Sequence, residues 1–169
     1  ADSNKGLSMR ADIIEAAKKA YASSGDAITL GSVLADGECD PEPIVRIPLA
    51  MLNRHGLIAG ATGTGKTRTL QLVAEQLSRA GVPVFLSDVK GDLSGVGAAG
   101  TPNDRITQRA KDTGFAWSPS AFPVEFLSLT GKSGAQLRAT VSAFGPLLLS
   151  KVLGLNDTQT SVLTLVFKY

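Results

Sequence analysis

The sequence predicts an α/β fold in which a parallel β-sheet is covered by helices. Two short apolar runs, 56–59 (GLIA) and 82–86 (VPVFL), flank a segment with helical periodicity at 67–80. Strands that are apolar on both faces and alternate with a helix are typical of a parallel sheet with both faces covered. We expect a right-handed crossover between the two strands. The hydrophobic fraction of 43% in 169 residues is enough for the core of one domain.

The sequence pattern before the strand–helix–strand segment 56–86 predicts a short helix and a strand. Residues 8–24 carry apolar side chains at helical spacing, and Gly25 ends that pattern. Residues 27–34 (AITLGSVL) then indicate a strand, and Asp36-Gly37 is typical of a tight turn.

Two prolines, Pro41 and Pro43, predict a boundary after this segment. We interpret 1–43 as an N-terminal appendage and 44–169 as the first portion of the main domain. The appendage has four Lys/Arg and eight Asp/Glu, whereas the main domain has thirteen and seven. This moderately basic charge permits an anionic ligand or a nucleic acid, and an ordinary solvated surface explains it equally well.

In the second half of the chain, apolar periodicity and capping residues predict further helices and one strand. In chain order these are a helix at 103–111, a strand at 123–129, a helix at 136–144 that breaks at Gly145-Pro146, a short helix ending at Gly154, and a last helix that begins at Asn156-Asp157.

The composition excludes several classes of protein. A single cysteine, Cys39, excludes an internal disulfide framework and any multi-cysteine zinc site. No apolar stretch approaches the length of a membrane span, and the N-terminus lacks the apolar core of a signal peptide. We therefore expect a soluble, cytoplasmic protein that does not enter a membrane.

Residues 60–67 (GATGTGKT) satisfy the phosphate-loop pattern G-x-x-x-x-G-K-[ST] at every required position. Glycines let the backbone N–H groups converge on a phosphate, and the positive end of the following helix points at the same anion. Lys66 would stabilise charge on the transferring phosphoryl group, and the Thr67 hydroxyl would hold Mg²⁺. The predicted nucleotide contacts are Gly60, Ala61, Thr62, Gly63, Thr64, Gly65, Lys66, Thr67 and Arg68.

A second ligand for this metal usually comes from an acid at the end of an apolar strand, and Asp88 after the run 82–86 fits that position. No glutamate that would orient an attacking water is evident. The base-reading signature N-K-x-D is absent from the sequence, which argues against a GTPase.

Two other glycine-rich stretches resemble nucleotide motifs but lack their context. Gly131-Lys132-Ser133 lacks the required earlier glycine, since position 126 is Phe126. The stretch 95–100 matches G-x-G-x-x-G, yet it neither follows a strand immediately nor opens a helix. We interpret both as loops.

Residues 52–96 (LNRHGLIAGATGTGKTRTLQLVAEQLSRAGVPVFLSDVKGDLSGV) resemble the bacterial HerA-like ATPases of the HerA/FtsK superfamily. The branch they resemble is described as HerA helicase-like C-terminal domain proteins. Residues 123–126 (PVEF) and 138–160 (RATVSAFGPLLLSKVLGLNDTQT) fit the same branch, so the resemblance covers most of 27–169. It implies a RecA-like P-loop ATPase core that uses ATP and Mg²⁺. It also implies a homo-oligomer, often a hexameric ring, with some relatives moving or unwinding DNA.

The same resemblance revises the role of Asp88. In this superfamily the metal-binding acid lies on a later strand, so Asp88, Lys90 and Asp92 would form a polar turn near the nucleotide. Direct metal ligation by Asp88 remains the lesser alternative. The family also continues beyond the position of Tyr169 to that strand, a sensor and a trans-acting arginine, so we expect the N-terminal part of a longer chain.

Three further side chains have two interpretations each. His55 is a hydrogen-bonded loop histidine or a neighbour of the nucleotide. Trp117 anchors a long loop by packing or stacks on a base. Arg138 is a solvated or salt-bridged helix residue or a charge stabiliser across a subunit interface.

The leading functional hypothesis is an Mg²⁺-dependent ATPase of the HerA-like kind, with DNA as its substrate by family analogy alone. The alternative is a nucleotide-binding switch or interaction module without appreciable turnover. A third hypothesis, a P-loop kinase for a small molecule, lacks support from an arginine-rich lid after the second strand.

Overall fold

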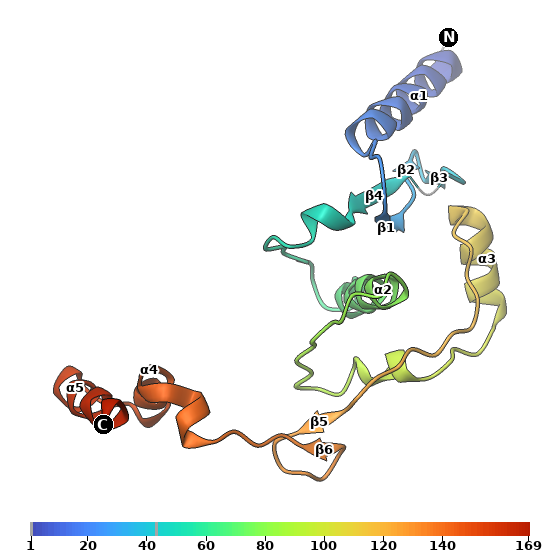
Figure 1. Ribbon diagram of the computed structural model, residues 1–169. Helices are drawn as coiled ribbons and strands as arrows, with labels where there is room; N and C mark the ends of the chain where they lie inside the picture. The colour runs from blue at the N-terminus through green and yellow to red at the C-terminus, as the bar shows by residue number, and fades with distance from the viewer. Residues whose placement is uncertain (1, 43) are drawn as a thin grey trace. The chain divides into compact units, whose positions relative to one another are not determined.

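The computed structural model describes residues 2–42 and 44–169, which form two compact units, Ala1–Pro123 and Val124–Tyr169 (Figure 1). Pro43, one of the two prolines at the predicted boundary, lies outside the described residues. Each unit is considered by itself below.

The described residues form helices and short strands in a mixed α/β order (Figure 1). The helices are α1 (Asp2–Ala20), η1 (Leu49–Met51), α2 (Lys66–Arg79), η2 (Ser94–Gly97), α3 (Asp104–Thr113), α4 (Val141–Leu153) and α5 (Asp157–Lys168). The strands are β1 (Ala27–Gly31), β2 (Leu34–Ala35), β3 (Glu38–Cys39), β4 (Val45–Pro48), β5 (Leu127–Ser128) and β6 (Ala135–Gln136). They pair as three two-stranded sheets among the described residues.

The first unit begins with two antiparallel strand pairs. β1 pairs with β4, with Ile28 opposite Ile47, and Ile28 is almost completely buried. β2 and β3 form a hairpin whose turn residues, Asp36 and Gly37, both have positive φ values of 53° and 79°. The predicted tight turn is confirmed. Two-residue hairpin turns of type I′ need left-handed backbone at both central residues, as these two residues have.

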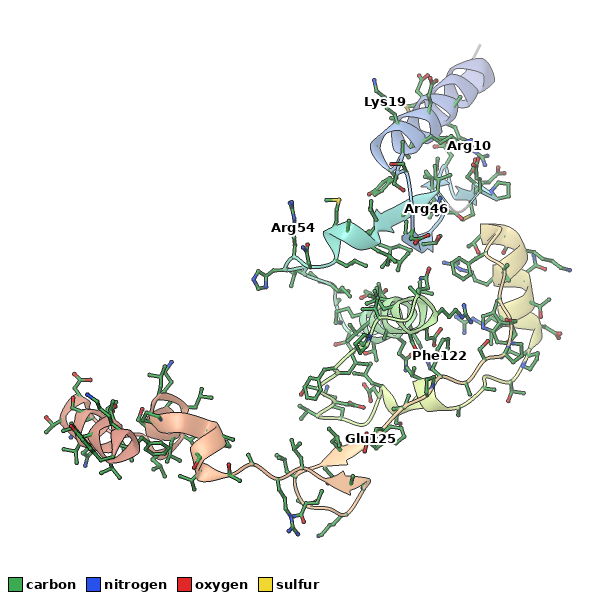
Figure 2. The ribbon with its side chains drawn as sticks, in the orientation of Figure 1. Arg10, Lys19, Arg46, Arg54, Phe122 and Glu125 are labelled. Carbon is green, nitrogen blue, oxygen red and sulfur yellow. The ribbon has the colours of Figure 1, made fainter. Side chains whose placement is uncertain are left out.

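Helix α1 is joined to β3 and to the segment that follows it by two ion pairs. The guanidinium of Arg10, which Figure 2 labels on α1, pairs with Glu38, and the Lys18 ammonium lies 2.6 Å from a Glu42 carboxylate oxygen. The Glu42 carboxylate raises the pKa of Lys18 by a hydrogen bond and by its charge. Exposed pairs of this kind contribute little stability, so they orient α1 more than they hold it.

Helix α2 is attached to β1 by one glutamine side chain. The Thr29 N–H donates to Gln76 Oε1 at 2.7 Å, and Gln76 Nε2 donates to the Thr29 carbonyl at 2.8 Å. A primary amide offers one donor and one acceptor side by side, which is the pattern of a neighbouring strand. Gln76 therefore occupies the place of a strand partner for β1.

We expect Gln76→Leu to lower the free energy of unfolding by about 1–3 kcal/mol, because both Thr29 backbone groups lose their partner. Chemical denaturation measures this loss. Gln108→Leu is the matched control, because among the residues that the structure describes the Gln108 amide bonds only to the exposed Asp112 carboxylate on α3. It should stay within about 0.5 kcal/mol of the parent. Equal losses in both variants would contradict the role of Gln76.

The structure confirms the coarser prediction of a mixed α/β fold, but in the part of the chain that it describes the strands form small two-stranded sheets and not the predicted large parallel sheet. Segments 56–59 and 82–86, expected as strands, pair with no other segment of the described chain. Leu57 and Phe85 are 89% and 81% exposed. A parallel strand needs hydrogen-bonded neighbours and helices over both faces, and the described chain brings neither to these runs.

The second unit combines a small parallel pair with two helices. β5 and β6 pair in parallel, and the predicted strand 123–129 is reduced to the two residues of β5. Gly134 lies so close to Phe126 that a Cβ there would be 2.2 Å from the Phe126 carbonyl oxygen. Only glycine permits this close approach of two backbone segments.

Helix α4 begins later than the predicted helix at 136–144. The Thr140 side chain accepts a hydrogen bond from the Ala143 N–H at 3.1 Å and so caps the helix there. The predicted break at Gly145-Pro146 is confirmed, since Gly145 has φ 66° and ψ 168° inside α4. Proline cannot donate to the preceding turn, so the helix bends at this position.

The predicted helix starts at residues 103 and 156 are confirmed. Asn103 accepts from the Ile106 N–H at the start of α3. Asn156 and Gln159 form a reciprocal capping box at the start of α5. No helix in the described part of the chain has the length and apolar character needed to cross a bilayer.

Candidate functional site

The glycine-rich segment 60–65 leads directly into α2, which begins at Lys66 as the sequence predicts. Gly63 and Gly65 have φ values of 84° and 95°, and Gly65 is the N-cap of the helix. This left-handed backbone costs little for glycine and about 1–2 kcal/mol for other residues. The two glycines therefore allow the sharp turn from the loop into the helix.

The loop is closed by contacts to the Ala61 carbonyl. Thr64 Oγ1 donates to this carbonyl at 2.8 Å, and Lys66 Nζ donates to it at 2.7 Å. Gly60 lies against the same contact, since a Cβ at this position would be 2.5 Å from Thr64 Oγ1. The structure thus brings the Lys66 ammonium back over the loop that precedes it.

The N-terminus of α2 has free capacity for an anion. Its N-cap, Gly65, supplies no side-chain hydrogen bond, and no acidic residue lies in its first turn. The first N–H groups of a helix have no intrahelical acceptor, and the helix dipole adds a partial positive charge there. By contrast, three later helices have side-chain caps from Asn103, Thr140 and Asn156.

Thr67 and Arg68 lie in the first turn of α2. The Thr67 hydroxyl makes no hydrogen bond to another group in the described part of the chain, so its oxygen is available as a ligand. The Arg68 guanidinium instead donates to Gln71 Oε1 at 2.9 Å. Residues 2–42 and 44–169 contain no group of three or more metal-ligating acids, histidines or cysteines.

Asp88 organises a turn after the second apolar run. One carboxylate oxygen accepts from the Gly91 and Asp92 N–H groups at 2.8 and 3.2 Å, and the other accepts from Leu93 at 2.8 Å. These backbone hydrogen bonds, foremost that of Leu93, lower the pKa of the Asp88 carboxyl. Both oxygens are engaged within the turn, as expected for a residue that shapes the turn.

We expect Asp88→Asn to loosen this turn, because an amide NH₂ replaces one of the two accepting oxygens. Amide hydrogen exchange at Gly91 and Leu93 should become faster. Acid should act in the same way: the stabilisation is complete above the unfolded-state pKa and is lost as pH falls through the lowered folded-state pKa. An NMR pH titration of the Leu93 amide follows this step. Asp92→Asn is the control, and an equal effect from it would contradict the assignment.

Gln71 joins this turn to α2, and sequence reasoning missed it. Its side chain is 5% exposed, and its Nε2 donates to the Asp92 carbonyl at 3.0 Å. This hydrogen bond connects α2 to the Asp88 turn. The Arg68 guanidinium, also on α2, donates to the Gln71 Oε1. The available signal was a polar residue three positions before the buried Ala74, on the helix face expected to be apolar.

Two other residues singled out from the sequence, His55 and Arg138, lie outside helices and strands. His55 is exposed in a segment without regular structure. Arg138 lies outside any helix and donates twice to Gln136 Oε1, at 3.1 and 2.8 Å. Farther along α2, the Arg79 guanidinium lies 5.1 Å from the centre of the Phe122 ring, whose position Figure 2 shows.

Fold and site together define a mixed α/β protein in which a glycine-rich loop opens a helix with an uncapped N-terminus. The chain belongs to the helicase HerA-like C-terminal family, whose model matches residues 34–169. This match confirms the HerA-like resemblance of the sequence and indicates, at a coarse level, a HerA/FtsK-type ATPase family. Neither a search of curated proteins nor a search of solved structures found a match.

Proposed function

We propose that this chain binds ATP with Mg²⁺ and hydrolyses it as a HerA-like P-loop ATPase. The observation that supports this proposal is the loop 60–65, whose left-handed glycines lead into an α2 terminus without a side-chain cap or an acid. Lys66 at the first position of that helix supplies the cation that such loops use against the β- and γ-phosphates. Family membership supports the same activity.

Each residue of the loop has a distinct task in this proposal. The backbone N–H groups of 63–67 bind the phosphates, and Lys66 exchanges its contact with the Ala61 carbonyl for phosphate oxygens. The Thr67 hydroxyl holds the magnesium ion, which would neutralise phosphate charge when bound. Arg68 stays on Gln71 and so keeps the Asp88 turn beside the helix.

We also propose the finer properties that the family suggests. In this proposal the protein is a DNA-directed motor that assembles as a homo-oligomeric ring in the cytoplasm and has a RecA-like sheet. The exposed apolar segments 56–59 and 82–86 are the ones that such a sheet would take up as strands, since burial of Leu57 and Phe85 would remove large apolar surfaces from water.

A second candidate function is a nucleotide-dependent switch without turnover. It is favoured by the Asp88 carboxylate, whose two oxygens are engaged in backbone hydrogen bonds, and by the absence of an acidic cluster in the described residues. Nucleotide binding would then order the loop and α2 without a base or second metal ligand for hydrolysis.

Phosphate release from MgATP, with and without duplex DNA, tests the proposal. DNA-stimulated release supports the motor, and release that DNA leaves unchanged supports an ATPase with another substrate. Binding of a fluorescent ATP analogue without release supports the switch. Absence of both binding and release would overturn the assignment of the loop.

A further inference from the structure

A shallow, open hollow lies on the surface of the first unit, outside the phosphate loop. It is a surface cavity of about 370 Å³ between the last turns of α3 and the loop after it. Its walls come from Thr107, Ala110 and Lys111 on the helix and from residues 114–117 (GFAW). We refer to it as the Trp117 cavity. Its volume is at the small end of the range for ligand sites.

The lining combines two aromatic side chains with one cation. Phe115 is partly buried, and Trp117 is 38% exposed, so each ring retains an accessible surface at the cavity. Trp117 also packs on Gly100, where a Cβ would be 3.4 Å from the indole. That contact fixes the indole against the preceding loop while leaving part of it open.

Lys111 is the charged residue of the lining. Within the described residues it takes part in no ion pair, and the neighbouring Asp112 carboxylate accepts a hydrogen bond from Gln108 at 2.7 Å. No carboxylate lines the cavity to oppose an anion. Two aromatic faces beside a cation match a planar base followed by its phosphate, which is how single strands are bound without sequence preference.

We propose that the Trp117 cavity binds one base of single-stranded DNA, with Phe115 and Trp117 stacking on the base and Lys111 contacting the adjoining phosphate. This inference rests on the proposed DNA-directed role and adds a site separate from the phosphate loop. It requires no nucleotide, so it is testable in the absence of ATP.

Trp117 is the single tryptophan of the chain, so its fluorescence reports directly on this cavity. The experiment titrates the full chain with an oligo-dT strand without ATP, and expects saturable quenching. Phe115→Leu keeps the apolar volume but removes a stacking face, so affinity should fall about tenfold. Lys111→Gln should lower the salt slope of log K by about 0.7, the value for one phosphate contact on a single strand.

The controls are Phe126→Leu and Lys132→Gln, which remove the same groups outside the cavity. Both should leave the titration unchanged. No quenching by oligo-dT, quenching only by a free mononucleotide, or equal effects of cavity and control variants would each overturn the inference. If Phe115→Leu fails to fold, Lys111→Gln alone decides. Absence of oligo-dT binding together with intact ATP hydrolysis would overturn this inference and leave the proposed ATPase function standing.

Discussion

Replacing Lys66 with alanine is expected to reduce ATP binding at least tenfold and to lower any turnover by about 10²–10³-fold. A preorganised positive charge at a developing anion contributes on this scale to catalysis. The Lys66 ammonium already lies at the loop, 2.7 Å from the Ala61 carbonyl oxygen, so little reorganisation is needed to reach a phosphate there. Titration with a fluorescent ATP analogue measures binding, and phosphate release measures turnover.

The matched control is Lys132→Ala. Lys132 stands in a glycine-lysine-serine stretch that resembles Gly65-Lys66-Thr67, but this stretch is an exposed loop between β5 and β6 rather than the start of a helix. The control should leave binding and turnover unchanged. Binding retained in Lys66→Ala, or lost equally in both variants, would show that residues 60–67 are not the nucleotide site.

Gly114→Ala is expected to destabilise the first unit by about 3 kcal/mol. Gly114 ends α3 with φ 62°, and a Cβ there would lie 1.5 Å from the Pro41 carbonyl oxygen. The left-handed conformation costs about 1–2 kcal/mol in alanine, and the forced displacement of backbone adds about 1–3 kcal/mol. Urea denaturation followed by the fluorescence of Trp117, in the same unit, measures the loss.

Gly81→Ala separates the two contributions. Gly81 follows α2 in the same unit with φ 76°, yet a Cβ there would meet no atom within 4 Å. It should therefore lose only the conformational part, about 1–2 kcal/mol. Equal destabilisation by the two substitutions would mean that α3 and the Pro41 segment do not approach each other in solution.

The local features of the fold could be predicted from the sequence because they depend on neighbouring residues. The start of α2 at the glycine-rich loop, the turn at Asp36-Gly37 and the cap at Asn156 all follow from one or a few adjacent side chains. The kink at Gly145 is of the same kind.

The features that depend on distant partners could not be predicted. The apolar runs 56–59 and 82–86 have the composition of buried strands, but a strand also needs neighbours, and composition does not reveal whether they are present. The amides of Gln71 and Gln76 bond to backbone groups 21 and 47 positions away. Helical periodicity marks such glutamines only as polar residues.

The pairing of β1 with β4 and with Gln76 has a practical consequence for anyone who expresses part of this chain. A polypeptide starting at Ile44 would keep β4 and α2 but lose the strand that both of them bind. β4 would then present an open edge with unsatisfied N–H and C=O groups, the usual template for intermolecular strand addition. Shortened versions intended for solution work should therefore start before Ala27, or precipitation will be mistaken for a property of the whole protein.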